Sequence, residues 1–223
     1  MQHLCFTDGV FTIRSPRSDA EWLQTRAVLL DSIEWMRAAL GIDLFAEQPS
    51  VIAELADLPA VYDGVRAVLL TAVTDGDELV VGTIGVRCHA DGTAELKRMY
   101  VRAVARRQGV GEALLAAAVE FARSRDARTM WLETARGPRD PAIALYARHG
   151  FVEVGARPGE LRIDRLVVME RPLEPGSGRG SLRLDRPTGT GRPEPGTPLV
   201  EPGGRSWEDR AWARVTVGHR PER

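Results

Sequence analysis

The feature that most constrains the fold is a predicted strand followed by a loop that ends in two glycines at the start of a helix. The stretch reads Ala94-Glu-Leu-Lys-Arg-Met-Tyr-Val101, then Arg102-Ala-Val-Ala-Arg-Arg-Gln-Gly-Val-Gly111. The first turn of a helix has unpaired backbone N–H groups and about half a positive charge, which together suit a phosphate group. Glycines there let a ligand approach the backbone with no Cβ in the way. The stretch therefore predicts an anion site at the helix start.

The charges around this loop agree with an anionic ligand. Five basic residues fall within 11 positions that contain no acid: Lys97, Arg98, Arg102, Arg106 and Arg107. The whole chain is nearly neutral, with 30 basic and 31 acidic residues and a net charge of −1. A protein that coats nucleic acid is usually more basic than this. The basic excess is local, so we expect a specific anion site and no nucleic-acid partner.

Two common phosphate-binding motifs do not fit the loop. The phosphate loop of nucleotide hydrolases needs Gly-Lys-Ser/Thr, whereas Gly111 is followed by Glu112 and Ala113. A dinucleotide fold needs Gly-x-Gly-x-x-Gly after a strand, and Leu114 stands at the third glycine position. The first motif therefore fails, and the second fits poorly.

Composition divides the 223 residues into three parts. We expect an N-terminal extension over 1–10, one domain over 11–172, and a Gly/Pro-rich, disordered tail over 173–223. The tail contains 9 Gly and 7 Pro in 51 positions, which resist regular structure. About 170 residues remain for the domain, enough to bury a core.

Within the domain, periodicity and turn signals predict the order β-α-α-β-β-β-α-β-α-β-β, an α/β fold with a mixed sheet. A helix is expected to begin at the capping box of Ser18 and Glu21 and to end at Gly41. A second helix is expected over 50–58, ending at Pro59. Later helices are predicted from Gly109 and from Pro141, the last closed by Gly150. The predicted strands are 11–14, 65–73, 79–86, 94–101, 129–133, 151–154 and 163–169.

Arg106-Arg-Gln-Gly-Val-Gly111 matches the Arg/Gln-x-x-Gly-x-Gly/Ala loop of the GCN5-related N-acetyltransferase (GNAT) family. Residues 95–101 resemble that family's fourth strand, and Ala142-Ile-Ala-Leu-Tyr-Ala-Arg-His-Gly-Phe151 resembles its last helix and Gly-Phe exit. The resemblance runs from Trp22 to Pro172. It implies the GNAT fold, a mixed and mostly antiparallel sheet flanked by helices, with a parallel pair splayed at the acetyl-CoA site.

The resemblance also implies the residues that hold acetyl-CoA, the cosubstrate. Backbone amides of the glycine loop would bind the pyrophosphate with two arginines beside them, and backbone groups of the preceding strand would meet the pantetheine arm. Thr134 and Ala142 would add contacts to coenzyme A. Family members often carry an Asn in the loop before the last helix, and Thr134 and Arg136 would replace it here. The implied cofactor residues are Met99, Tyr100, Val101, Arg106, Arg107, Gln108, Gly109, Val110, Gly111, Thr134 and Ala142.

The preceding strand carries an irregular pattern. Leu96 has one parity, whereas Met99 and Val101 have the other, and one extra residue between them would restore a single buried face. We predict a β-bulge over 98–100, which is where the resembled family splays its strand.

Acetyl transfer to an amine needs a proton acceptor, because an amine with a pKa of about 10.4 is almost fully protonated at neutral pH. Glu95 stands 14 residues before Gly109, the spacing at which the histone-modifying branch of the family places its general base. The alternatives are that Glu95 is simply solvated, and that another base or a relay water serves.

Tyr146 is the second predicted catalytic residue. It lies five residues before Phe151, where the family has a tyrosine that protonates the departing thiolate of coenzyme A. A phenol with a pKa near 10 suits that leaving group. The alternative is a core tyrosine between helix and sheet.

The expected function is transfer of an acetyl group from acetyl-CoA to a primary amine of a small molecule or peptide, by direct attack in a ternary complex. Neither Cys5 nor Cys88 falls in the recognised motif, so no covalent enzyme intermediate is implied, and the cysteine spacing predicts no metal site. The alternative is a coenzyme-A-binding sensor or interaction module without turnover. An RNA-binding adaptor is disfavoured, since the tail's net charge is only +2.

The remaining expectations concern location and partners. The N-terminus lacks a basic segment with an apolar stretch, and no apolar run reaches about 20 residues, so we expect a cytoplasmic protein with no membrane contact. The sequence leaves open whether the protein forms a homodimer. Acceptor specificity is placed at 35–62 and 157–165. Leu44, Phe45 and Tyr62 suggest an apolar wall there. Glu47, Asp57 and Asp63 could attract a cationic amine, and surface solubility explains these acids equally well.

Overall fold

The computed structural model describes residues 11–62, 64–136, 141–155 and 166–174. The predicted extension over 1–10, nearly all of the predicted tail over 173–223 and the whole segment 157–165 lie outside these residues, as do Asp63 and the predicted cap Asp140. Expectations about them stay predictions.

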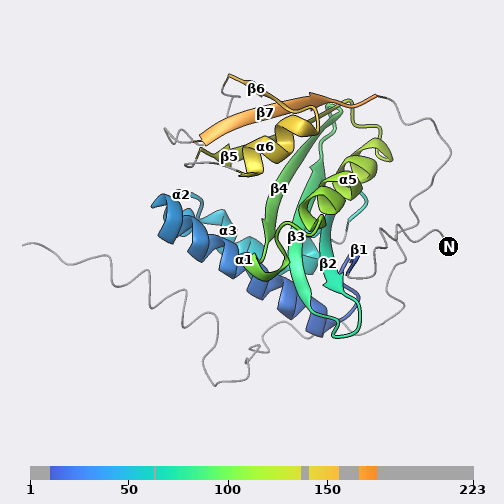
Figure 1. Ribbon diagram of the computed structural model, residues 1–223. Helices are drawn as coiled ribbons and strands as arrows, with labels where there is room; N and C mark the ends of the chain where they lie inside the picture. Colours follow the sequence, from blue (N-terminus) through green and yellow to red (C-terminus); the bar gives the residue numbers. More distant parts are fainter. Residues whose placement is uncertain (1–10, 63, 137–140, 156–165, 175–223) are drawn as a thin grey trace, which may run out of the picture. The chain divides into compact units, whose positions relative to one another are not determined.

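Seven strands form one mixed sheet in the order β1-β2-β3-β4-β5-β7-β6 (Figure 1). Its strands are β1 (Phe11–Arg14), β2 (Ala67–Thr74), β3 (Val80–Cys88), β4 (Thr93–Val101), β5 (Thr129–Ala135), β6 (Val152–Val154) and β7 (Leu166–Pro172). Among these described strands, only β4 and β5 pair in parallel, and every other pair is antiparallel. The predicted α/β class, the mixed sheet and its parallel pair are confirmed.

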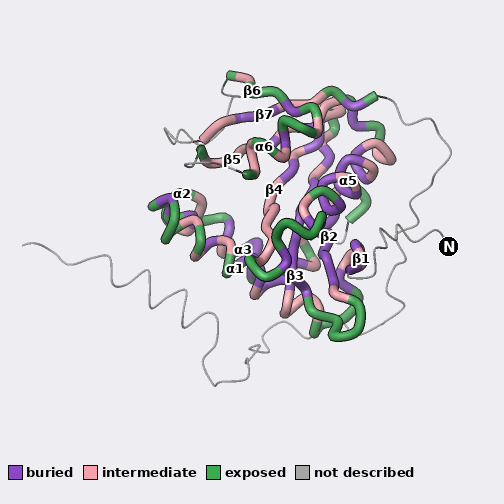
Figure 2. The backbone as a smooth tube through the Cα atoms, viewed as in Figure 1, coloured by how far each residue is buried: buried purple, intermediate pink, exposed green. Residues whose placement is uncertain are grey.

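Helices cover both faces of the sheet. The helices are α1 (Asp19–Leu40), α2 (Leu44–Glu47), α3 (Ser50–Ala56), α4 (Leu58–Tyr62), α5 (Val110–Arg123) and α6 (Pro141–Arg148), with a 3₁₀ turn at Ala103–Ala105. The larger buried cluster joins α5 and α6 to the sheet, and a second cluster joins α1–α4 to its other face. Figure 2 shows the buried residues running through β2, β3 and α5.

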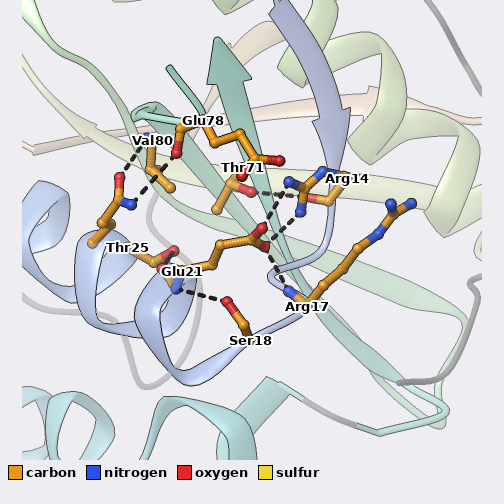
Figure 3. Close-up of polar contacts among 9 residues, drawn as sticks. Arg14, Arg17, Ser18, Glu21, Thr25, Thr71, Glu78 and Val80 are labelled. Atoms are coloured by element: carbon orange, nitrogen blue, oxygen red, sulfur yellow. Dashed lines mark hydrogen bonds and ion pairs between the residues drawn. The ribbon is translucent and has the colours of Figure 1, made fainter. Parts of the chain in front are cut away.

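The start of α1 follows the predicted capping signal with one difference. The Ser18 hydroxyl accepts a hydrogen bond from the Glu21 backbone N–H at 3.3 Å. The Glu21 carboxylate binds the Arg17 backbone N–H at 2.6 Å and makes a bidentate pair with Arg14 of β1 (Figure 3). The cap therefore also ties the helix to the sheet edge. At the other end, Gly41 has φ 68°, as the predicted stop requires.

The predicted second helix, over 50–58 and ending at Pro59, is wrong in its end. Helix α3 stops at Ala56, and Pro59 lies inside α4. Proline is tolerated there because it occupies the first turn, whose N–H groups have no acceptor within the helix. Asp57 begins this turn, since its carboxylate accepts the Ala60 backbone N–H at 3.0 Å. The sequence reading also missed the short helix α2, which Asp43 caps.

The predicted bulge in β4 is confirmed. The β3 partners Thr83 and Gly85 pair with Tyr100 and Lys97, so β4 holds one extra residue between two pairs. Arg98 lies in the bulge and has a φ of 55°, a value that is uncommon for residues other than glycine. The buried hydroxyl of Thr83 donates to the Arg98 carbonyl at 2.9 Å and holds the bulge from the β3 side.

No helix among the described residues combines the length and apolar composition that crossing a membrane would need.

Candidate active site

The start of α5 has the geometry of an anion site. Gly109 precedes the helix with φ 79°, and Arg107 also has a positive φ of 60°. The first hydrogen bond within the helix runs from the Ala113 N–H to the Gly109 carbonyl, at 3.0 Å. The N–H groups of Val110, Gly111 and Glu112 precede it in the chain, where a helix provides no acceptor of its own. A Cβ added to Gly109 would meet no atom within 4 Å, so the space before the loop is open. These features fit a pyrophosphate.

Gly111 joins the helix start to the bulged strand. A Cβ built on Gly111 would lie 3.5 Å from Met99 Cε and 3.4 Å from a methyl group of Leu145 on α6. The backbone of α5 therefore passes close to both β4 and α6, and it brings two of the predicted cofactor residues, Gly111 and Met99, close together.

The loop side chains do not all point to the helix start. Arg106 donates to the Val101 carbonyl at 2.9 Å, and its guanidinium lies over the rings of Tyr100 and Trp35, 5.5 and 5.9 Å from their centres. Arg106 thus connects the loop to α1. Gln108 donates its side-chain amide to the Val104 carbonyl at 2.9 Å, which leaves its backbone to the loop. Arg107 is exposed.

Strands β4 and β5 separate beside this loop. Their parallel pairing ends at Leu96 and Leu132, although β4 continues to Val101 and β5 to Ala135. A cavity of about 210 Å³ adjoins the separated strands, between them and the helices α1–α3. Six of the predicted site residues line it: Glu95, Met99, Tyr100, Thr134, Ala142 and Tyr146. The other predicted residues, Val101 and 106–111, belong to the loop region and are not in this lining.

Tyr146 has features of both alternatives, a core tyrosine and a catalytic tyrosine. Its side chain is buried, packs against the Phe151 ring at 5.8 Å, and also lines the cavity. Its hydroxyl donates to Met99 Sδ at 3.2 Å. Gly150, with φ 81°, ends the helix, and the Phe151 N–H returns to the Tyr146 carbonyl at 3.1 Å. Gly150 and Phe151 therefore end the helix one turn after Tyr146 and help to hold Tyr146 in position.

Glu95 is half-buried in the same lining and has close basic neighbours. Lys97 Nζ lies 3.0 Å from one carboxylate oxygen, and His89 Nε2 lies 4.0 Å from the other. Because Lys97 donates to one oxygen of Glu95, it occupies part of the hydrogen-bonding capacity of this carboxylate.

The other residue expected to replace the family's Asn lies elsewhere. Arg136 makes an exposed ion pair with Glu153 at 2.6 Å and does not line the cavity, whereas Thr134 does. The described residues contain no group of three or more His, Cys, Asp or Glu that could hold a metal ion.

The sequence reading missed a buried network under the cavity. Arg98 binds Glu54 of α3 through two hydrogen bonds of 2.7 and 2.8 Å, and the Tyr62 hydroxyl donates to Glu54 at 2.7 Å. Burial opposes ionisation of Glu54, but these partners outweigh it and hold the pKa of its carboxyl below the usual value. Burial beside Glu54 raises the pKa of Tyr62 far above its usual value. The available signal was an acid among Val51, Leu55 and Leu58, on the apolar face of the helices.

The sequence and the fold both have known relatives. The model of the acetyltransferase (GNAT) family matches residues 33–151. A curated relative, aminoglycoside N(6')-acetyltransferase type 1 of Klebsiella aerogenes, is 33% identical over 132 residues, which cover 56% of this chain and 85% of that protein.

Solved structures share the fold. A GNAT-family acetyltransferase from Staphylococcus aureus Mu50 has a TM-score of 0.61 at 18% identity, over 74% of this chain and 99% of that one. The PaiA N-acetyltransferase from Thermoplasma acidophilum, in complex with coenzyme A, has a TM-score of 0.55 at 18% identity, over 73% and 98%. The bulged and separated strands beside a glycine loop, together with the match over more than half of the sequence, lead to one conclusion: the chain belongs to the acetyltransferase (GNAT) family.

Proposed function

We propose that the protein transfers an acetyl group from acetyl-CoA to a primary amine of a small molecule or peptide, by direct attack of the amine in a ternary complex. The observation that carries the proposal is the position of the Tyr146 hydroxyl. It lies against Met99 in a cavity beside the separated strands, and Met99 in turn lies next to Gly111 at the helix start. The relatives add support, since one is named as an aminoglycoside N-acetyltransferase and another was solved with coenzyme A.

The loop would hold the cosubstrate through its backbone. The amides of Gln108, Gly109, Val110 and Gly111 would bind the pyrophosphate at the positive end of α5, with Arg107 in reach from the exposed side of the loop. Beyond the bulge, Met99 and Val101 have no paired residue in β5, and their backbone groups would bind the pantetheine arm. When bound, acetyl-CoA supplies the thioester carbonyl that an amine can attack.

Two side chains would move the protons. Glu95 would accept a proton from the incoming ammonium group, directly or through water, to give the neutral amine. As the C–N bond forms and the C–S bond breaks, Tyr146 would donate its hydroxyl proton to the leaving thiolate. The second proton of the attacking nitrogen would then restore the Tyr146 hydroxyl, directly or through water. Such acid–base steps contribute roughly 10²–10⁴ in rate each.

Direct attack of the amine on the thioester, with no acetyl-cysteine intermediate, agrees with the burial of Cys88. Cys88 is buried, and burial raises the pKa of its thiol, so it remains a weak nucleophile at neutral pH. It also does not line the cavity. An acetyl-cysteine intermediate has no support from this residue.

The test separates an enzyme from a sensor that only binds the cosubstrate. Calorimetry with acetyl-CoA measures binding, and a panel of amino acids, polyamines, aminoglycosides and peptides measures release of free thiol. We expect binding and amine-dependent thiol release. Binding with no turnover of any amine would favour the sensor, and no binding of acetyl-CoA or coenzyme A would overturn both.

A further inference from the structure

The helical wall of the cavity is almost entirely apolar. Helices α1–α3 and their connections contribute eleven lining residues, of which nine are apolar and two, Ser32 and Gln48, are neutral and polar. Ile33, Met36, Ile42 and Leu44 represent this wall, which curves from α1 into α2. No charged side chain of the described residues comes from this side of the cavity.

Charge is confined to the sheet side and is largely paired there. The charged lining residues are Glu95, Lys97, Arg98 and Glu133, two acids and two bases. Lys97 lies 3.0 Å from Glu95, and Arg98 is bound by Glu54. A second ammonium group on a ligand would therefore meet the apolar wall or compete with Lys97 for Glu95.

The two sequence interpretations of the acceptor region can now be compared. Of the residues expected to form the apolar wall, Leu44 lines the cavity, whereas Phe45 and Tyr62 do not. Glu47 and Asp57, from the cationic interpretation, do not line it. The described part of the acceptor region therefore offers an apolar surface and no extra carboxylate for a polycation.

From this arrangement we infer that the acceptor is a primary monoamine with an apolar body, which lies against Ile33, Met36 and Leu44 while its amine reaches Glu95 and Tyr146. The inference rests on the proposed function and names its substrate class. It differs from the aminoglycoside in the name of the curated relative. Burial of the apolar body supplies the affinity, and the paired charges give a polycation little compensation for its lost hydration.

A chain-length series with the unaltered protein tests the inference. Propylamine, butylamine, pentylamine and hexylamine share one reacting group, so kcat/KM should rise about fourfold for each added methylene that the cavity buries. The decisive pair is hexylamine and 1,5-diaminopentane, which differ only by a terminal methyl against a terminal ammonium group. Hexylamine should be preferred by at least about tenfold, since burying an unpaired charge is costly.

Two matched variants tie the preference to this wall. Met36→Glu places a carboxylate in the lining at a half-buried position, and it should lower the hexylamine/diaminopentane ratio by about tenfold or more through a new ion pair. Leu30→Glu adds the same charge to the same helix at another half-buried position, outside the lining, and should leave the ratio unchanged. Thermal melts establish that both variants are folded.

The outcomes separate this inference from the proposed function. Turnover of diaminopentane, spermidine or kanamycin above that of hexylamine would overturn the apolar acceptor and leave acetyl transfer intact. A flat chain-length series would do the same. Binding of acetyl-CoA without turnover of any amine would overturn both. A rising series, with the ratio moved by Met36→Glu and not by Leu30→Glu, would support the inference.

Discussion

Tyr146 has a hydrogen bond that suits a proton donor waiting for a substrate. Its hydroxyl donates to the thioether of Met99, and a thioether sulfur is a weak acceptor. A thiolate that forms nearby would be a much stronger acceptor for the same proton. The buried ring, held by Phe151, keeps the hydroxyl at this position.

Tyr146→Phe removes the hydroxyl and keeps the ring. We expect kcat to fall by roughly 10²–10⁴, the usual range for a lost general acid, while the Kd of acetyl-CoA changes less than about threefold. Thiol release measures the first quantity and calorimetry the second. Unchanged turnover would mean that Tyr146 is only a core residue.

Glu95→Gln tests the proton acceptor. Without a base, only the amine that is already neutral can attack, so kcat/KM should rise about tenfold per pH unit up to the amine pKa. The unaltered protein should show a flatter profile between pH 6 and 9. The measurement is a pH–rate profile with one amine, and identical profiles would assign the proton transfer to another group or to water.

At the scale of elements, the bulge in β4 is held on two sides. The hydroxyl of Thr83 binds the Arg98 carbonyl, and Glu54 binds the Arg98 guanidinium from α3. A non-glycine residue with φ 55° costs of order 1–3 kcal/mol, so these contacts stabilise a backbone that would otherwise relax. The bulge in turn sets Met99 beside Tyr146 and Gly111.

Glu54→Gln should release the bulge, and Glu21→Gln is its control. Both glutamates make bidentate pairs with a mostly buried arginine, but the pair of Glu21 and Arg14 lies at the β1 edge (Figure 3). Each variant should lose about 3 kcal/mol of unfolding free energy, as expected when one partner of a buried pair is removed.

Only Glu54→Gln should also weaken acetyl-CoA binding, by about tenfold, because only this pair adjoins the site. Urea unfolding and calorimetry supply the two quantities. Equal effects of both variants on acetyl-CoA affinity would show that Glu54 acts through global stability alone.

The loop glycines of α5 make different demands. Gly109 has a positive φ and open space around it, whereas Gly111 has an ordinary φ and near neighbours. Gly109→Ala should weaken acetyl-CoA binding about tenfold or more, since a left-handed conformation costs an L-residue roughly 1–2 kcal/mol. Gly111→Ala should be tolerated, because its Cβ would lie at ordinary contact distances. Calorimetry with both variants checks this order, and the reverse order would place the anion elsewhere.

At the scale of the whole molecule, arginine–carboxylate pairs join the helices α1–α4 to the sheet. Glu21 pairs with Arg14 of β1, and Glu54 pairs with Arg98 of β4. The arginines hold the pKa of both carboxyls below the usual value, although burial acts in the opposite direction. The layer that walls the cavity therefore depends on ionised carboxylates.

This dependence predicts how stability varies with pH. A lowered folded-state pKa stabilises the fold above the ordinary carboxyl value of about 4.3, and the contribution is lost as the pH falls through the folded-state value. The stability difference between the unaltered protein and Glu54→Gln should thus be full at pH 7 and shrink below about pH 4. Urea unfolding at pH 7, 5, 4 and 3 measures it, and a difference that stays constant with pH would contradict the argument.

Local patterns were enough to predict most elements, the bulge in β4 and the glycine loop at the start of α5. The cap at Ser18, the stop at Gly41, the glycine loop and the parity change around Arg98 each depend on residues close together in the chain. Their physics is local: a hydrogen bond, a φ angle or a side-chain period. The resemblance added Glu95 and Tyr146, and the structure places both in one cavity.

Only the tertiary structure decided which distant residues meet. Helical spacing could have placed Glu54 on an apolar face, but its partner Arg98 is 44 positions away, and no local rule identifies it. The break at Pro59 was also misjudged, because a proline can end one helix or begin the next. Burial and ion pairing depend on the packing of α1–α4 against the sheet, which balances many weak, long-range contributions that no short window of sequence contains.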